Sequence, residues 1–316
     1  MPVGEFALID RWFRRPGRRS DVVLGVGDDA ALLRVPQDRE LVAATDTLVE
    51  GRHFLAGIEA RSVGHQALAV NLSDLAAMGA EPAWALLSLS LPEVEEAWLD
   101  EFAAGFFALA DRCGIELIGG DTVRGPRVIT VTALGLVEPG TALRRDGARP
   151  GDGVYVSGTP GEAAAGLELL RSGRREQAPG LVRRQLYAEP RLALGRALRG
   201  LASAAMDVSD GLAGDLARLC AASGVGAELQ LEQLPVSPAL RAVLPPANAE
   251  HYVLHGGDDY ELLFTLPAVR EAQLADVIDE SCPITRIGHI VAQGGLRARR
   301  GDRVVDIEAR GHDHFA

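Results

Sequence analysis

Apolar residues recur along this chain in two alternating patterns, short runs typical of strands and longer Ala/Leu-rich stretches typical of helices. In the first half, short apolar runs predict strands at residues 22–25, 30–35, 41–45, 84–91, 115–118 and 128–137. Helices are predicted at residues 5–15, 62–78 and 92–112. Gly79 and Gly114 follow two of these helices, where glycine favours a helix end. This order predicts an α/β half with mixed strands.

The second half continues the alternation. Strands are predicted at residues 154–157, 204–208, 226–231, 260–266 and 284–290, and helices at 162–171, 211–223 and 269–280. Residues 172–190 are polar and are expected to form a loop with part of a helix. Residues 145–152 contain Gly147, Pro150 and Gly151 and are interpreted as the junction between domains. The pattern predicts an α/β fold with α+β mixed sheets, with residues 1–140 as the N-terminal domain and 141–316 as the C-terminal domain.

Composition narrows the classes of function. The 316 residues are 47% apolar and 24% charged, as in ordinary globular proteins of about two domains. The net charge of -12 argues against a nucleic-acid partner. All 32 Lys/Arg positions are arginine, which excludes the P-loop lysine, the strand lysine of protein kinases and Schiff-base chemistry. Any bound nucleotide is therefore expected to be held by metal ions, backbone amides and arginine.

Cysteine usage and hydropathy indicate the compartment. Cys113, Cys220 and Cys282 are far apart and odd in number, which fits a reducing environment. The arginine-rich start lacks the apolar core of a signal peptide, and no apolar stretch is long enough to cross a membrane. We expect a cytoplasmic protein with no membrane partner.

Six short segments place aspartate beside glycine or a hydroxyl residue. They contain Asp28-Asp29, Asp46, Asp74, Asp121, Asp207 with Asp210, and Asp258-Asp259. Grouped carboxylates repel one another unless a cation offsets them, and magnesium binds through a few carboxylates together with waters and substrate phosphates. Each segment alone could be a turn or a helix cap. Asp74 is harder to explain that way, because it lies inside an Ala/Leu-rich helical stretch. Together the segments predict a site for a metal–nucleotide complex.

In order along the chain, these segments resemble the thiamine-monophosphate kinase family. The resemblance runs from about residue 4 to the end, and is carried most specifically by residues 45–54, 69–80, 119–122, 207–212, 256–262 and 311–315. It implies an aminoimidazole ribonucleotide synthetase-like fold, with an N-terminal ATP- and magnesium-binding domain that pairs in a homodimer and a C-terminal domain that closes over the nucleotide. The implied reaction is direct in-line transfer from ATP to thiamine monophosphate, the last step of thiamine diphosphate biosynthesis.

The resemblance also implies roles for individual residues. The implied magnesium ligands are Asp29, Thr45, Asp46, Asp74, Asp121, Asp207 and Asp210. Asp46, Asp121 and Asp210 are the implied catalytic residues, and Gly120, Asp121, Arg145 and Ser209 are the implied ATP contacts. His53, Asp258 and Phe315 are the implied contacts to the thiamine substrate. Ala44 departs from the family, since some relatives carry a serine there that helps to bind metal.

Two alternatives remain open. One is a sister ATP-dependent synthetase of the same superfamily. Selenophosphate synthesis generally needs a reactive cysteine near the N-terminus, and none precedes Cys113, while the hydrogenase-maturation relative uses a C-terminal cysteine where this chain ends in Phe315-Ala316. The other alternative is a non-catalytic nucleotide or metal sensor, which loss of motif aspartates would favour, yet all of them are present. Phosphoryl transfer itself needs positioning and charge neutralisation more than covalent chemistry.

Overall fold

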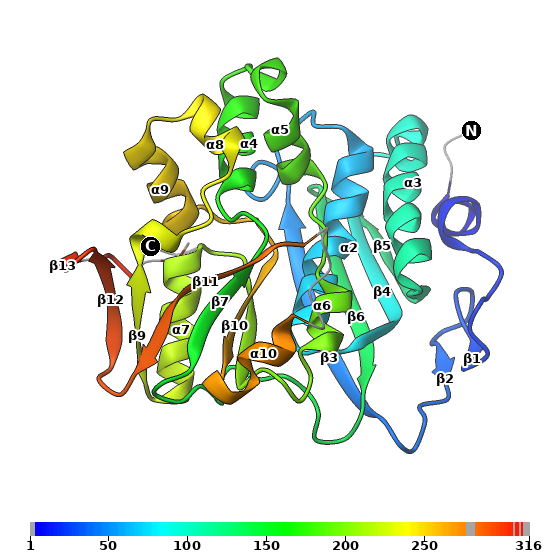
Figure 1. The fold of residues 1–316 in the computed structure, drawn as a ribbon. Helices are drawn as coiled ribbons and strands as arrows, with labels where there is room; N and C mark the ends of the chain where they lie inside the picture. Colours follow the sequence, from blue (N-terminus) through cyan, green and yellow to red (C-terminus); the bar gives the residue numbers. More distant parts are fainter. Residues whose placement is uncertain (1–3, 276–281, 306, 310, 312–316) are drawn as a thin grey trace. The chain divides into compact units, whose positions relative to one another are not determined.

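The computed structural model describes residues 4–275, 282–305, 307–309 and 311, and shows two compact units (Figure 1). The N-terminal unit contains Met1–Leu75 and Ala80–Gly140, and the C-terminal unit contains Ala76–Gly79 and Thr141–Ala316. Residues 276–280 of the helix expected at 269–280, and the candidate substrate contact Phe315, lie outside the described residues.

The N-terminal unit is built on a four-stranded sheet in the order β3-β6-β4-β5. Its strands are β3 (Glu40–Val49), β4 (Glu81–Leu91), β5 (Glu116–Arg124) and β6 (Val128–Val137). The β4–β5 pair is parallel, and β6 pairs with β3 and β4 in antiparallel fashion. Ahead of the sheet come α1 (Glu5–Leu8), a π-helical turn (Ile9–Phe13) and a small hairpin of β1 (Val22–Leu24) and β2 (Leu32–Leu33).

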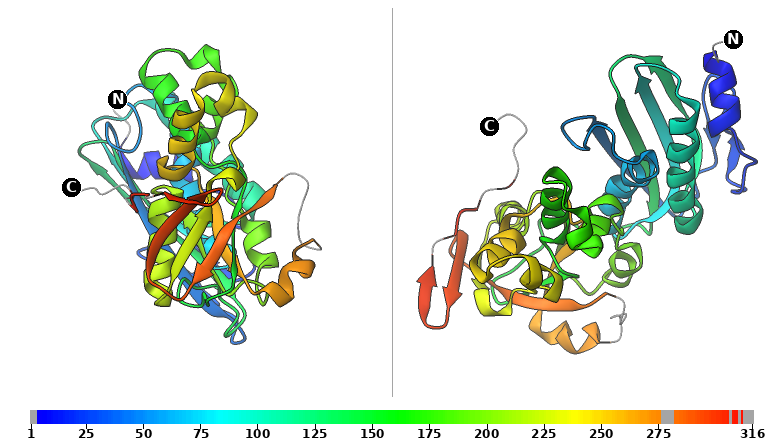
Figure 2. Two further views of the ribbon diagram at one scale, coloured as in Figure 1. Left: turned by 60° about the vertical axis from the view of Figure 1, so that its left-hand side comes forward. Right: turned by 90° about the horizontal axis from the view of Figure 1, so that it is seen from above.

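Two long helices, α2 (Ala60–Ala77) and α3 (Glu96–Cys113), accompany this sheet, and α3 runs alongside it in Figure 2. The helices approach each other closely at Gly105, where an added Cβ would lie 1.9 Å from the carbonyl oxygen of Arg61. α2 is buried along almost its whole length, which explains its Ala/Leu-rich sequence. Asp74 interrupts a run of buried residues in this helix and is itself only half-buried.

Two strands of this unit are longer than the apolar runs predicted. The run at 41–45 forms the first half of Glu40–Val49, and the run at 115–118 begins one residue before Glu116–Arg124 and covers its start. Asp46 and Asp121 therefore lie inside strands rather than after strand ends, which corrects the expectation from the sequence. The polar segment of β3 is accommodated because β6 pairs with it along its length, and hydroxyls meet across the pair at Thr47 and Thr130, 2.8 Å apart.

The C-terminal unit contains a seven-stranded sheet in the order β13-β12-β9-β11-β7-β10-β8. Its strands are β7 (Gly153–Ser157), β8 (Ala204–Val208), β9 (Gly226–Gln230), β10 (Glu261–Leu266), β11 (Ile284–Val291), β12 (Gly295–Arg300) and β13 (Arg303–Val305). The β12–β9 pair is parallel and the other pairs are antiparallel. The sequence pattern did not indicate β12 and β13, whose many arginines hide the strand alternation.

Helices surround this sheet. α4 (Glu162–Arg171), α5 (Pro179–Leu186), α8 (Pro238–Val243) and α9 (Pro246–His255) gather beyond one end of it (Figure 1). α7 (Leu212–Ser223) contacts β8, β9, β10 and β12. Short helices α6 (Leu192–Ala197) and α10 (Glu271–Leu274) complete the unit, with 3₁₀ turns at Arg175–Gln177, Leu231–Gln233 and Ala268–Arg270. In the described part of the chain, no helix combines the length and the apolar character needed to span a membrane.

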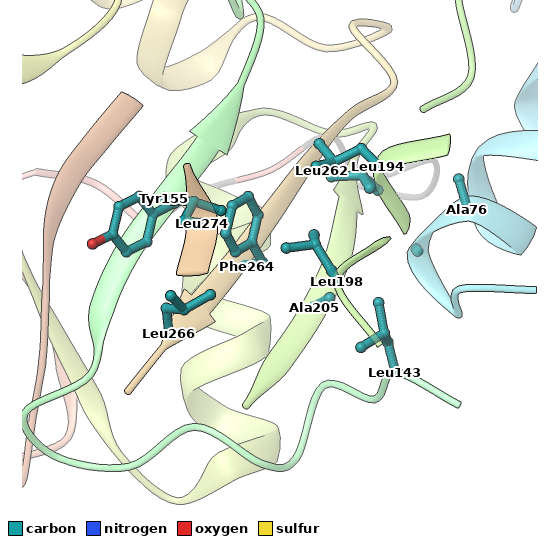
Figure 3. Close-up of a cluster of buried hydrophobic side chains, with 11 residues drawn as sticks. Ala76, Leu143, Tyr155, Leu194, Leu198, Ala205, Leu262, Phe264, Leu266 and Leu274 are labelled. Atoms are coloured by element: carbon teal, nitrogen blue, oxygen red, sulfur yellow. The ribbon is translucent and has the colours of Figure 1, made fainter. Parts of the chain in front are cut away.

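A hydrophobic cluster anchors β7 and β10 to the short helices (Figure 3). The rings of Tyr155 and Phe264 stack with centroids 5.5 Å apart and planes 12° apart. Leu262, Phe264 and Leu266 alternate along β10 and join a cluster that includes Leu194 of α6. This core fixes the strand whose first residues follow the acidic loop at 256–260.

Candidate active site

Asp46 of β3 and Asp74 of α2 are brought together by the fold. Their side chains share a hydrogen bond, and burial raises the pKa of Asp46 above its ordinary value, while that hydrogen bond and the charge of His53 oppose the rise. Two carboxylates in contact hold a proton between them unless a cation takes its place. The pair offers only oxygen donors, which is the donor set that magnesium prefers. These residues therefore fit a magnesium site.

The loop after β3 fixes the ring of His53. The backbone N–H of Val49 donates to His53 Nδ1 at 3.0 Å, and the backbone N–H of His53 donates to the carbonyl of Val49 at 2.9 Å. Because Nδ1 accepts a hydrogen bond, a neutral imidazole here carries its proton on Nε2. The sequence motif thus forms a compact turn that sets both the orientation and the tautomer of this histidine.

Asp121 lies on β5, at the opposite edge of the sheet from Asp46. Gly120 before it has φ +152°, and an added Cβ would lie 1.8 Å from the carbonyl oxygen of Leu87, so only glycine fits. Asp46 is in register with Val131, Leu87 and Gly120 across the sheet. Three strand spacings amount to about 14 Å, so the structure does not bring Asp46 and Asp121 into contact.

Two further candidate ligands of the N-terminal unit also stand apart from the Asp46–Asp74 pair. The hydroxyl of Thr45 donates to the carbonyl of Val131 at 3.1 Å and lies 3.0 Å from the hydroxyl of Thr132. Thr45 neighbours Asp46 in a strand, so their side chains point to opposite faces of the sheet. Asp29 lies exposed between β1 and β2, where its backbone N–H donates to the carboxylate of Asp28 at 2.8 Å.

In the C-terminal unit, the candidate residues Asp207, Ser209 and Asp210 lie at the end of β8 and in the turn into α7. Asp207 is buried, whereas Ser209 and Asp210 are half-buried. The turn is held by Asp215, whose Oδ2 accepts the backbone N–H groups of Ser209 and Asp210, each at 3.0 Å. Arg218 contacts the carboxylates of both Asp210 and Asp215.

Sequence reasoning missed Asp215 and Arg218. The signal was nonetheless available, because Asp215 is a carboxylate among the Leu and Ala residues of a helix, as Asp74 is. Asp215 has no exposed surface, and burial is the main cause that raises the pKa of its carboxyl group, with the charge of Asp210 adding to it. Such a buried acid in a helix needs a partner, and here its partners are the candidate ATP- and metal-binding turn and Arg218.

The acidic loop before β10 has an unusual backbone conformation. Asp258 and Tyr260 have φ values of +65° and +53°, the only positive values among the described non-glycine residues. The loop is tied to the β8 turn, since the N–H of Asp258 donates to Ser209 O and that of Tyr260 to Val208 O, both at 2.8 Å. Strain of this kind persists where surrounding structure enforces it, and it often marks a functional site.

Beneath this loop lie two buried acids. Asp259 accepts the backbone N–H groups of Gly161 at 2.5 Å and Ala163 at 3.2 Å, which caps the start of α4. Burial raises the pKa of Asp259 to about 8. Glu261 pairs with Arg184 at 2.7 Å and with Arg191, whose hydrogen bond and charge hold the pKa of Glu261 below its ordinary value although burial opposes this. These pairs make the base of the loop rigid.

The remaining candidate, Arg145, is exposed on a turn, where its backbone carbonyl accepts a hydrogen bond from the Ser223 hydroxyl at 2.7 Å. Across the described residues, no three or more His, Cys, Asp or Glu side chains are close enough to hold one metal ion. The candidate ligands instead form small groups in two units. That arrangement is compatible with magnesium, which usually binds through one or two carboxylates and completes its shell with waters and substrate phosphates.

Comparison with known proteins gives the same picture along the whole chain. Residues 27–137 match the family model of the AIR synthase related protein N-terminal domain, and residues 149–301 match the model of its C-terminal domain. Thiamine-monophosphate kinase of Escherichia coli (strain K12) is 46% identical over 323 residues, which cover 100% of this chain and 99% of that protein.

Two solved structures extend the comparison. The crystal structure of thiamine-monophosphate kinase from Stenotrophomonas maltophilia K279a is 48% identical, with a TM-score of 0.88 over 94% of this chain and 97% of that chain. AaThiL complexed with AMPPCP and TMP is 34% identical, with a TM-score of 0.79 over 99% of this chain and 97% of that chain. By sequence and by fold, the chain belongs to the thiamine-monophosphate kinase family.

Proposed function

We propose that this protein transfers the terminal phosphoryl group of ATP to thiamine monophosphate, giving ADP and thiamine diphosphate. The observation that carries the proposal is the likeness to thiamine-monophosphate kinases over the full chain. One structural relative is complexed with AMPPCP and TMP, an ATP analogue and the acceptor. The acceptor is already a phosphate, ionised near neutral pH, so the reaction needs positioning and charge neutralisation rather than a strong base.

Magnesium ions would be held by the candidate aspartates of both units. The Asp46–Asp74 pair is supported by its shared hydrogen bond, and Asp207 and Asp210 by their place at the end of β8. We assign Asp29, Asp121 and Thr45 to the same role as weaker candidates. Among the described residues neither aspartate joins the Asp46–Asp74 pair in a three-ligand group, and the side chain of Thr45 points to the other face of the sheet. When bound, the ions offset the repulsion between the phosphates of the two substrates.

The chain's own groups would position the substrates. Gly120, exposed on the edge strand β5, is the candidate backbone contact to a phosphate, Ser209 lies in the turn held by Asp215, and Arg145 supplies positive charge at the nucleotide. His53, with its proton on Nε2, and Asp258 are the candidate contacts to thiamine monophosphate. Phe315 keeps the same assignment from the sequence motif alone.

A homodimer is part of this proposal. One face of the four-stranded sheet carries apolar side chains that are unusually exposed, with Leu41 at 49%, Val123 at 48% and Leu86 at 36%. An exposed apolar sheet face of this kind is typical of an interaction surface. We infer that a second copy covers it, which Val123→Asp would oppose: light scattering should give a dimer for the native chain and a monomer for the variant. A cytoplasmic location is proposed because Cys113, Cys220 and Cys282 are not joined by disulfides in the part of the chain that the structure describes.

Mass spectrometry of a reaction with purified protein, ATP and magnesium tests the activity, with thiamine monophosphate and free thiamine offered in parallel. Thiamine diphosphate formed from the monophosphate alone, and only with magnesium present, would establish the kinase reaction. If the folded protein binds ATP but makes no product from either acceptor, a sister synthetase or a nucleotide sensor would replace the proposal.

A further inference from the structure

Gln185 occupies a position of α5 where an apolar residue is expected. The buried side of this eight-residue helix consists of Leu181, Val182, Gln185 and Leu186. Gln185 is 5% exposed, so its amide lies in the interior between apolar neighbours on the same helix face. A polar residue at a core position destabilises the fold unless its hydrogen bonds are complete, so an incompletely bonded one indicates a role other than stability.

The hydrogen bonds of Gln185 are only half complete. Its Nε2 donates to Oδ2 of Asp258 at 3.2 Å. A carboxylate accepts hydrogen bonds and cannot donate one when ionised, so the amide nitrogen must be the atom that faces Asp258. The amide oxygen then points elsewhere, and among the described residues this buried Oε1 has no hydrogen-bond partner. Leucine or methionine would fill the same space without leaving a buried acceptor unpaired.

Asp258, which accepts this hydrogen bond, has a backbone conformation that non-glycine residues rarely adopt. Asp258 has φ +65° and Tyr260 has φ +53°, and the Tyr260 hydroxyl donates to Asp258 Oδ1 at 3.3 Å. The two carboxylate oxygens of Asp258 are thus each engaged by a different side chain. The side chain that binds Asp258 leaves a buried oxygen unpaired, and Asp258 and Tyr260 both have left-handed backbones. Both features cost stability, which indicates that the orientation of the Asp258 carboxylate matters more than local stability.

We propose that Gln185 is a positioning residue for Asp258, and that together with Tyr260 it fixes the direction in which this carboxylate meets thiamine monophosphate. The inference rests on the proposed function, in which Asp258 contacts the thiamine substrate. The amide oxygen of Gln185 is buried. We therefore infer that Gln185 acts through Asp258 and does not touch the substrate.

The test replaces Gln185 by methionine, which has a similar length and no hydrogen-bond donor. For Gln185→Met we expect the KM for thiamine monophosphate to rise about 10-fold, as for loss of a hydrogen bond to a charged group, with the KM for ATP within about twofold of the native value. The melting temperature should stay the same or rise, because the unpaired oxygen is removed. A purely structural glutamine would change stability and leave the two KM values in their native ratio.

Gln66 provides a matched control, since it is also 5% exposed but lies in α2 of the other unit. Gln66→Met should leave both KM values unchanged. If Gln185→Met does not fold, Tyr260→Phe removes the second hydrogen bond with little change in volume, and it should raise the KM for thiamine monophosphate about threefold. A KM for thiamine monophosphate within twofold of native in the folded variant overturns the proposal.

Asp258→Asn separates failure of this inference from failure of the proposed function. If Asp258→Asn leaves the KM for thiamine monophosphate unchanged, the assignment of Asp258 to the substrate is wrong. If Asp258→Asn raises that KM and Gln185→Met does not, the assignment stands and the positioning role is wrong. If Gln185 acts through Asp258, the double variant should match Asp258→Asn alone, because the two effects are not additive.

Discussion

Nη1 of Arg218 lies 2.7 Å from Oδ1 of Asp215 and also contacts the carboxylate of Asp210. The other oxygen of Asp215 accepts the backbone N–H groups of Ser209 and Asp210. One buried carboxylate therefore holds the backbone of the turn that we assign to ATP and magnesium, and one arginine balances the charge of both aspartates. Both supporting side chains, Asp215 and Arg218, come from α7.

Removing the charge of Asp215 should loosen that turn. Asp215→Asn keeps the shape of the side chain but places an amide N–H group against either Arg218 or the two backbone N–H groups, all of which are donors. We expect the KM for ATP to rise about 10-fold and the free energy of unfolding to fall by about 1–3 kcal/mol. Steady-state kinetics and urea unfolding measure the two effects.

Asp152 provides the control for a general effect of buried acids. It is 5% exposed and accepts the Arg149 N–H group at 3.0 Å and the Ser203 hydroxyl at 2.6 Å. Asp152→Asn should lose stability while the KM for ATP stays native. Equal KM values for ATP in the two variants would show that Asp215 supports the fold and not the nucleotide site.

Asp46→Asn should remove most of the activity and leave the fold intact. Asp46 is half-buried and its carboxyl is hydrogen-bonded to Asp74, so an uncharged amide of the same shape costs the apo protein little. We expect kcat/KM to fall by at least about 100-fold, together with weaker binding of Mn²⁺ followed by electron paramagnetic resonance. Asp121→Asn should behave alike, whereas Asp38→Asn, at an exposed turn, should be native in both measurements. Native turnover in the folded Asp46 variant would contradict the metal assignment.

His53→Asn separates the two nitrogens of the imidazole. The amide oxygen of asparagine can take the place of Nδ1 and accept the Val49 N–H group, while the Nε2 position is lost. If His53 contacts thiamine monophosphate, the KM for this substrate should rise about 10-fold with little change in melting temperature. His53→Ala should lose the turn as well and melt at a lower temperature. An unchanged KM in the asparagine variant would leave His53 with a structural role.

The apolar pattern predicted the exact ends of three elements. The strands Val128–Val137 and Ala204–Val208 and the helix Glu162–Arg171 have the ends that the pattern predicted. The apolar pattern did not predict the end of a strand where pairing with another strand determines it. β3 continues through Asp46 because β6 supplies hydrogen bonds along it, and this pairing is not visible in a local polar run.

The same limit applies to the candidate site. Asp46, Asp74 and Asp210 could be chosen as candidates from the sequence, because each lies in a segment that places aspartate beside a glycine or a hydroxyl residue. Asp215 and Gln185 could not be chosen in that way, since their importance lies in what they contact. A polar residue on the apolar side of a helix is a local signal for both, and it identifies the residue without identifying its partner.

Asp259 should make folding stability depend on pH. Burial raises its pKa to about 8, against an ordinary value of 3.8, although the N–H groups of Gly161 and Ala163 and the charge of Arg184 oppose the rise. Between these two values the folded protein keeps a proton that the unfolded chain releases. The stabilisation is therefore complete below pH 3.8 and is lost as the pH rises towards about 8, at up to about 1.4 kcal/mol per pH unit.

Asp259→Asn isolates this contribution, because asparagine caps a helix about as well as aspartate and does not ionise. Urea unfolding of both proteins at pH 6 and pH 8 should show the variant gaining about 2 kcal/mol relative to the native chain over that interval. The variant gains relative stability because only the native chain must ionise a buried Asp259 as the pH rises. All other titrating groups are common to both proteins. A difference that is the same at the two pH values would mean that Asp259 is ionised throughout, with the α4 N-terminus and Arg184 supplying enough positive potential to overcome its burial.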